Sequence, residues 1–117
     1  MADGVTLDQV REMALALPSV EEGITSGTPT FRVRGRFLAR VRPDGQSLVL
    51  RMGLAEREVL TRVRPAAYYV TEYHAESPLV VVRLAAVSRE EFAEHLADAW
   101  RSVAPERLVL THEAAVH

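Results

Sequence analysis

The sequence contains no cysteine, and all 14 of its basic residues are arginine, so lysine is absent as well. The lack of cysteine excludes disulfides, thiolate nucleophiles and cysteine-ligated metal sites, and it fits a reducing compartment. No apolar run approaches the roughly 20 residues that a membrane-spanning helix needs. Residues 1–10, MADGVTLDQV, lack the basic and apolar regions of a signal peptide. We therefore expect a cytoplasmic protein without a membrane anchor.

Catalytic signatures are also missing. The four histidines (His74, His95, His112 and His117) lie in unrelated sequence settings. His95 has an acid, Glu91, one helical turn earlier, but no further residue completes a metal-ligand spacing. Serine and histidine do not form a nucleophile-elbow motif, and the glycines form no phosphate-binding loop. The sequence therefore predicts a protein that is not an enzyme and that has neither a metal site nor a cofactor.

The chain length and charge limit the remaining choices. A chain of 117 residues suits one compact domain, whose ordered core we expect over about residues 5–110. The net charge of −2 argues against a protein that coats nucleic acid indiscriminately. Nine arginines and three acids between residues 32 and 64 give that stretch a charge of +6, whereas the remainder, with five arginines and 13 acids, carries −8. We therefore expect one basic surface on an otherwise acidic molecule.

Residues 30–52, TFRVRGRFLARVRPDGQSLVLRM, form the most informative stretch. They predict three short strands joined by tight turns at Arg34-Gly35 and Pro43-Asp44-Gly45. Alternation along these strands separates an apolar face from an arginine face. The predicted apolar face comprises Phe31, Val33, Phe37, Ala39, Val41, Leu48, Leu50 and Met52. The predicted arginine face comprises Arg32, Arg34, Arg36, Arg40, Arg42 and Arg51.

The arginine face has two explanations at this stage. An antiparallel sheet with one solvent-exposed face needs polar residues there. However, Arg32 and Arg34 are expected opposite Arg40 and Arg42, and like charges on facing strands cost stability. Acids from the helices, a partner chain or phosphate groups are expected to offset that repulsion.

Apolar residues recur at helical spacing in four segments, which cover residues 7–17, 54–63, 89–103 and 105–110. Thr6 with Gln9 and Ser88 with Glu91 have the spacing of capping boxes. Trp100 lies on the apolar stripe of the third segment. The residues after the fourth segment are expected to fray.

Residues 67–73 and 79–85 predict two more strands. Alternation in the first places Tyr69 and Tyr73 on one side, followed by His74, so these residues either pack at the rim of the core or border a ligand groove. Short strands linked by tight turns, together with amphipathic helices, indicate an α+β fold in which an antiparallel sheet carries its helices on one face.

Several segments resemble the MmcQ/YjbR family of small bacterial proteins, over about residues 6–110. These are TLDQVREMALALPSVEEGITSGTPTFRVRGRFLARV, YYVTEYH, SPLVVVRLAAV and DAWRSVAPERLV. The resemblance implies a CyaY-like, or frataxin-like, two-layer fold and a DNA-binding role in which hairpins act as a double wing. The chain departs from the family pattern after His74, where HAESPLV replaces a glycine and tryptophan near the proline. It also lacks an acidic ridge for iron, because its first helix offers only Asp8 and Glu12.

Carried over to this chain, the wings are the turns at Arg34-Gly35 and Pro43-Asp44-Gly45. Phosphate contacts are then expected from Arg32, Arg34, Arg36, Arg40 and Arg42. The first hypothesis is a monomeric DNA-binding protein that contacts mainly phosphates. The alternative is a small-ligand or protein-interaction module whose arginines meet an acidic partner. An enzyme that uses Tyr69, Tyr73 and His74 ranks third.

Overall fold

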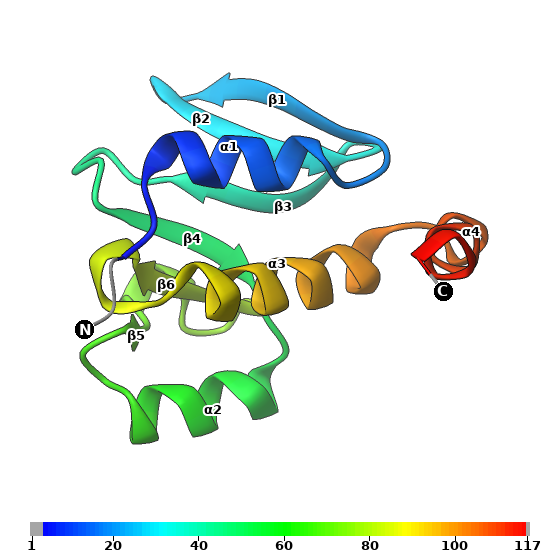
Figure 1. The fold of residues 1–117 in the computed structure, drawn as a ribbon. Coiled ribbons are helices and arrows are strands. Elements are labelled where there is room, and N and C mark those ends of the chain that lie inside the picture. Colours follow the sequence, from blue (N-terminus) through cyan, green and yellow to red (C-terminus); the bar gives the residue numbers. More distant parts are fainter. Residues whose placement is uncertain (1–3, 117) are drawn as a thin grey trace.

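The computed structural model describes residues 4–116, which form one six-stranded antiparallel sheet with α-helices against it (Figure 1). The strand order is β1-β2-β3-β4-β6-β5. The strands are β1 (Val20–Thr25), β2 (Thr28–Val33), β3 (Arg36–Val41), β4 (Ser47–Arg51), β5 (Tyr68–Tyr69) and β6 (Leu79–Arg83). The α-helices are α1 (Leu7–Leu15), α2 (Leu54–Val63), α3 (Arg89–Val103) and α4 (Glu106–Val116). Short 3-10 helices occur at η1 (Glu72–His74) and η2 (Leu84–Ala86).

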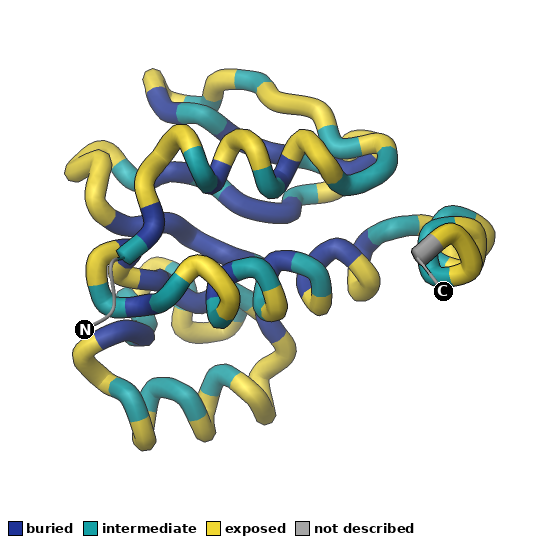
Figure 2. Tube along the Cα trace, viewed as in Figure 1, coloured by how far each residue is buried: buried dark blue, intermediate teal, exposed yellow. Residues whose placement is uncertain are grey.

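Helices α1 and α3 lie on the same face of the sheet, and α4 extends beyond the end of α3 (Figure 1). The main core lies between these helices and the sheet, where buried stretches of the chain face one another (Figure 2). It includes Val10, Phe31, Leu50, Phe92 and Trp100. The expected α+β architecture, with helices on one face of an antiparallel sheet, is confirmed. No helix within residues 4–116 has the length and apolar character needed to cross a membrane.

The two predicted helix starts form for local reasons. At α1, the Gln9 backbone N–H donates to Thr6 Oγ1 at 3.1 Å, and the Thr6 N–H donates to Gln9 Oε1 at 3.0 Å. This is a complete capping box. At α3, the Glu91 N–H donates to Ser88 Oγ at 3.1 Å. The Glu91 side chain turns away from the cap and contacts residues outside the helix.

Both predicted turns are present. Arg34 and Gly35 have φ angles of 50° and 84°, as a two-residue type I′ hairpin turn requires. In the second turn, the Asp44 carboxylate accepts N–H bonds from Gln46 and Ser47 at 2.8 and 3.0 Å. The first turn lets β3 return along β2, and the hydrogen bonds of the second turn hold the return of β4 along β3.

A β-bulge in β3 overturns part of the predicted alternation. Phe31 pairs with Ala39 and Arg32 with Phe37, so Leu38 is an extra residue on β3. Leu38 is buried in the main core. Because the bulge reverses the alternation of the residues before it, Arg36 faces the helices and Phe37 faces the opposite side, the reverse of the expectation.

Three segment predictions also need correction. The strand expected over residues 67–73 ends at Tyr69 and is followed by η1. The strand expected over residues 79–85 ends at Arg83, where η2 begins. The last helix continues to Val116 instead of ending at Leu110.

The sheet face opposite α1 and α3, hereafter the second face, is only partly exposed. Opposite residues of antiparallel strands share a face, and the register aligns Arg40, Val49, Val81 and Tyr69 across β3, β4, β6 and β5. Val49 and Val81 are buried, although they lie outside the main core. Thr30 and Ser47 are buried as well. The expectation of a fully solvated arginine face is therefore wrong at its centre.

Candidate functional site: the arginine-rich second face

Three of the five arginines expected to contact DNA lie on the second face. Arg32 is opposite Phe37, and Arg40 is opposite both Thr30 and Val49. Arg42 lies two residues beyond Arg40 and therefore shares its face. The expected juxtaposition of arginines on facing strands does not occur, because neutral residues occupy the opposite positions. The predicted like-charge repulsion is thus weaker than the sequence suggested.

The other two arginines lie at the β2–β3 turn, away from this group. Arg34 occupies the turn itself and borders a small cavity with Pro105, Leu108 and Thr111 of the α4 region. Arg36 faces α3 and its Nη1 donates to the Val103 carbonyl at 3.5 Å. The predicted set of five therefore separates into a second-face group and a turn group.

None of these five arginines forms an ion pair with a carboxylate in the part of the chain that the structure describes. The arginines that do so are Arg11, Arg62, Arg64 and Arg101. Glu21 is directly opposite Arg32 on β1, but the two do not form an ion pair. The second-face arginines therefore lack a carboxylate at ion-pair distance. The charge of Arg42 does reach Asp44, since it contributes, after the Gln46 N–H, to lowering the pKa of that carboxyl group.

Tyr69 joins the arginines on the second face. Its hydroxyl accepts a hydrogen bond from Arg42 Nη1. The Arg83 guanidinium lies 4.2 Å from the Tyr69 ring centroid, and that of Arg42 lies at 5.9 Å. This stacking is a cation–π arrangement that orders both cations above the sheet. Sequence analysis identified Tyr69 but not its partner Arg83.

His74 lies near the same arginines, and its only aromatic contact within the described residues is an edge-on one with the ring of Tyr73, at 5.0 Å between centroids. Burial, followed by the charges of Arg40 and Arg42, lowers the pKa of His74. His74 is therefore neutral at pH 7 and adds no charge to the second face. Tyr73 is 87% exposed, because the chain leaves the strand before reaching it. The three residues of the predicted ligand groove thus lie in different environments.

The Arg57 side chain holds the segment that carries His74 through hydrogen bonds to backbone carbonyls, hereafter the Arg57 clamp. From α2, Arg57 Nη1 donates to the carbonyls of Ser77 and Leu79 at 2.8 and 3.0 Å, and Nη2 donates to that of Ala75 at 2.8 Å. A guanidinium can satisfy several acceptors at once because its five N–H groups are arranged in a planar fork. The sequence does not indicate this role, because nothing near Arg57 in the chain marks its acceptors.

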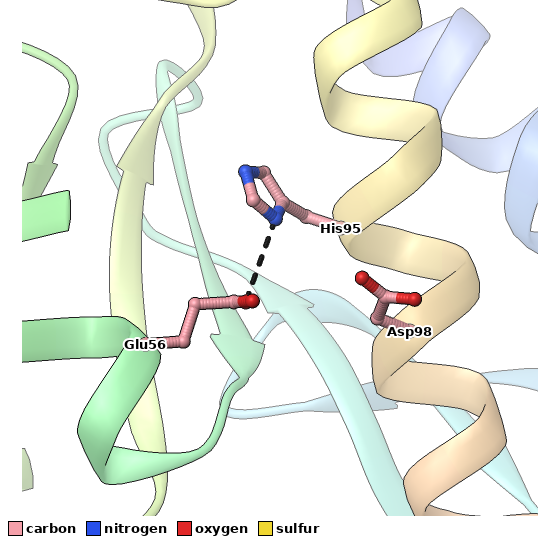
Figure 3. Close-up of side chains that lie close together, drawn as sticks. All are labelled: Glu56, His95 and Asp98. Atoms are coloured by element: carbon pink, nitrogen blue, oxygen red, sulfur yellow. Dashed lines mark ion pairs between the residues drawn. The ribbon is translucent and has the colours of Figure 1, made fainter. Parts of the chain in front are cut away.

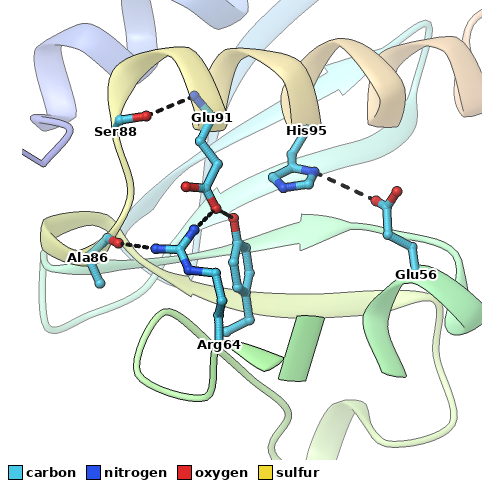
Figure 4. Close-up of polar contacts among 7 residues, drawn as sticks. Glu56, Arg64, Ala86, Ser88, Glu91 and His95 are labelled. Carbon is cyan, nitrogen blue, oxygen red and sulfur yellow. Dashed lines mark hydrogen bonds and ion pairs between the residues drawn. The ribbon is translucent and has the colours of Figure 1, made fainter. Parts of the chain in front are cut away.

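A second polar network lies on the face of the sheet that carries α1 and α3, hereafter the helical face (Figure 4). The Glu91 carboxylate accepts hydrogen bonds from Arg64 at the end of α2 and from the hydroxyl of buried Tyr68 on β5. Burial opposes ionisation of Glu91, but the bonds from Tyr68 and Arg64 outweigh it and lower the pKa of the carboxyl group. Burial and the neighbouring carboxylate raise the pKa of Tyr68. This network joins α2, β5 and α3.

Replacing Glu91 with glutamine is expected to reduce the acid sensitivity of the fold. Since the folded-state pKa of Glu91 is lowered, its ionised form contributes stability above the unfolded-state pKa, and this contribution is lost as pH falls through the folded-state value. Glu91→Gln should cost about 1–3 kcal/mol at pH 7 and progressively less in acid. Urea unfolding at pH 7 and at pH 3 measures both values. A cost that is independent of pH would contradict this role.

The helical face also holds a cluster that the sequence did not predict. His95 on α3 lies near Glu56 of α2 and Asp98 of α3 (Figure 3). Sequence spacing could not identify the set, because Glu56 comes from a different helix. The expectation of no metal-ligand spacing around His95 concerned the sequence alone, and the fold brings two acids close to this residue.

Comparison with known proteins agrees with the fold. A protein from Deinococcus radiodurans, DR2400, whose crystal structure is described as a DUF419 domain, superposes with a TM-score of 0.76. The match covers 90% of this chain and 83% of that protein, at 22% sequence identity. At this identity the likeness concerns the fold alone. No curated protein shows a significant match.

The family comparison agrees with the resemblance found in the sequence. The model of the family described as YjbR matches residues 15–102. That range extends from the end of α1 almost to the end of α3, and so includes the whole sheet. The chain belongs to the YjbR family.

Proposed function

We propose that the protein binds DNA through phosphate contacts made by Arg32, Arg40 and Arg42 on the second face. The observation that carries the proposal is the lack of a carboxylate partner for these three arginines, within residues 4–116. Unpaired guanidinium groups form strong, charge-assisted hydrogen bonds with phosphate oxygens. Such contacts hold a protein on DNA without reading the base sequence.

The geometry of β3 suits a phosphate backbone. Arg40 and Arg42 are two residues apart, so their Cα atoms are separated by about 6.8 Å along the strand. The two side chains can therefore reach different phosphates. Stacking between Tyr69 and Arg83 beside them keeps a further cation on the same face. The turn residue Arg34 extends from the opposite end of β3 and would act as the wing in this proposal.

A comparison of three double variants tests which arginines bind. We expect Arg40→Gln with Arg42→Gln to weaken binding to all DNA sequences by a similar amount. The slope of log K against log salt concentration should become less steep by about 2. Glutamine keeps part of the arginine stem on the sheet while removing the charge. Arg34→Gln with Arg36→Gln measures the turn group separately. Arg62→Gln with Arg89→Gln removes the same charge from α2 and α3 and serves as the control.

The pKa of His74 provides a local test of the binding position. A phosphate held near Arg40 and Arg42 should offset their positive charge and raise the pKa of the imidazole. An NMR titration of His74 with and without a short duplex measures this shift. If DNA binds but the pKa of His74 is unchanged, contact at the second face is excluded and the turn group becomes the candidate.

An acidic polypeptide is the second candidate partner. Phe37 is only half-buried on the second face opposite Arg32, and an apolar ring beside a cation suits a protein surface better than a phosphate backbone. Displacement of bound DNA by poly-glutamate at equal charge concentration would favour this alternative. Displacement by inorganic polyphosphate but not by poly-glutamate would favour the DNA proposal.

A further inference from the structure

Glu56, His95 and Asp98 bring three ligand-type atoms together between α2 and α3 (Figure 3). Each residue offers one nitrogen or oxygen atom, and all three atoms lie within 4.8 Å of one another. The Nδ1 atom of His95 is 3.6 Å from Glu56 Oε1. His95 and Asp98 are three residues apart on α3, so they face the same side of that helix. The cluster is independent of the second face, which lies across the sheet.

The Nδ1 atom of His95 is buried and lacks a hydrogen-bond partner within the described chain. A buried polar atom without a partner is costly, and such atoms in native structures point to an ion, a water molecule or a functional role. Glu56 Oε1 lies 3.6 Å from this nitrogen, which is within ion-pair distance but longer than a hydrogen bond.

The separation between His95 and Glu56 suits a metal ion. With metal–ligand bonds of about 2.1 Å, the ligand atoms of a tetrahedral zinc site are about 3.4 Å apart. The observed 3.6 Å between Nδ1 and Oε1 is close to that value. Glu56 and Asp98 are partly exposed and can rotate to complete the set, since their side chains are 47% and 58% accessible.

The surroundings hold the imidazole in place and leave room for an additional ligand. The His95 ring meets Tyr68 edge-on, with ring centroids 5.5 Å apart, and Tyr68 is itself fixed by Glu91 (Figure 4). A cavity of about 230 Å³ opens beside the cluster, lined in part by Met52 and Ser102. A metal bound by three protein atoms would therefore keep an open coordination position toward this cavity.

Two charged neighbours act on the cluster. Arg101 donates to Asp98 Oδ1 at 2.8 Å, which orients the carboxylate and leaves its other oxygen available. Arg51 also lines the cavity, but its Nε donates to the Phe37 carbonyl at 3.2 Å. A free cation nearby would lower metal affinity, and this hydrogen bond engages Arg51 with a backbone carbonyl of β3.

We propose that Glu56, His95 and Asp98 form a binding site for a divalent transition-metal ion of the Zn²⁺ class. One imidazole nitrogen with two carboxylate oxygens favours zinc and its first-row neighbours over Mg²⁺ or Ca²⁺, which take oxygen ligands. The site links α2 to α3, so the bound ion should also stabilise the packing of α2.

The direct test is isothermal titration of the tag-free protein with zinc chloride. We expect one ion per chain, together with a higher melting temperature in the presence of zinc. Replacing Zn²⁺ with Co²⁺ should give the visible absorption of a four-coordinate site. No heat and no change in melting temperature with Zn²⁺, Co²⁺, Ni²⁺ or Mn²⁺ would overturn the proposal.

Variants assign the site to these residues. Glu56→Gln and His95→Gln should each weaken zinc binding at least tenfold. Glu90→Gln makes the same carboxylate change on α3 outside the cluster and should bind as the original chain does. Glu56 is exposed, so its variant is expected to fold, which circular dichroism verifies. Undiminished binding by both Glu56→Gln and His95→Gln would place the metal at other residues and reject the proposed site.

Discussion

Replacing Trp100 with alanine is expected to lower the free energy of unfolding by about 3–5 kcal/mol. Trp100 is 1% exposed at the centre of the contact between α3 and the sheet. Its Nε1 donates to the Pro18 carbonyl at 2.9 Å, which ties α3 to the end of α1. Its ring meets His112 of α4 at 5.1 Å between centroids. One side chain therefore connects α3 with the core, with α4 and with the turn between α1 and β1.

Chemical denaturation of the Trp100 variants measures this effect. Trp100→Phe serves as the matched control, because it keeps an aromatic ring and removes only the indole hydrogen bond and part of the volume. We expect it to cost less than half as much as Trp100→Ala. A loss below about 1 kcal/mol for Trp100→Ala would be too small for a buried tryptophan and would contradict the placement of α3.

Replacing Arg57 with alanine is the second change with a large expected effect. The Arg57 guanidinium donates to four backbone carbonyls in the segment that follows β5, at His74, Ala75, Ser77 and Leu79. Hydrogen bonds from a charged donor contribute about 1.5–3 kcal/mol each in favourable cases. Because the released carbonyls can accept water, we expect a total loss of about 2–3 kcal/mol.

Hydrogen exchange distinguishes this local effect from general destabilisation. In Arg57→Ala, amides of residues 70–78 should exchange faster, while those of β2 and β3 change little relative to global stability. Arg57→Lys keeps the charge but cannot contact several carbonyls in one plane. It should therefore resemble the alanine variant more than the original chain. Unchanged exchange in residues 70–78 would show that the clamp does not hold this segment.

Local signals in the sequence account for the parts of the fold that were predicted correctly. The Thr6–Gln9 capping box and the Arg34-Gly35 turn each form within a few residues, so their chemistry is visible in the chain itself. The bounds predicted for α2 agree with the observed helix. Its apolar residues do not pack as expected, however, since Leu54, Val59 and Val63 are all more than half exposed.

The features that sequence analysis missed depend on tertiary contacts. Leu38 is the extra residue of the bulge in β3, and its side chain is buried in the core. Because of the bulge, Arg36 and Phe37 lie on the faces opposite to those that strict alternation predicts. Glu91 satisfied the spacing of a capping box, yet its side chain contacts Arg64 and Tyr68 from distant segments. The position of Arg64 and Tyr68 beside the start of α3 therefore decides the partners of Glu91, and local spacing does not reveal it.

The sequence identified the arginines of the candidate site, but it did not predict how they are arranged on the surface. Five arginines were expected on one surface, and the structure divides them between the second face and the β2–β3 turn. The contribution of each group to DNA binding can be measured separately, because the two groups can be neutralised independently. No arginine stands opposite Arg32 or Arg40, whose neighbours are neutral apart from Glu21 on β1, and this removes the repulsion that first suggested an anionic partner. The proposal now depends on the lack of acidic partners.

The salt dependence of DNA binding tests the central proposal most directly. Fluorescence anisotropy of a labelled duplex at several salt concentrations gives the slope of log K against log salt, which is near −0.9 for each phosphate contacted. With three to five arginines engaged, we expect a slope of roughly −3 to −4 and an affinity in the micromolar range or weaker. The proposal is supported if the slope lies in this range and its magnitude decreases by about 2 in the double variant Arg40→Gln with Arg42→Gln. Flat anisotropy at low salt, or a slope unchanged by that double variant, would contradict it.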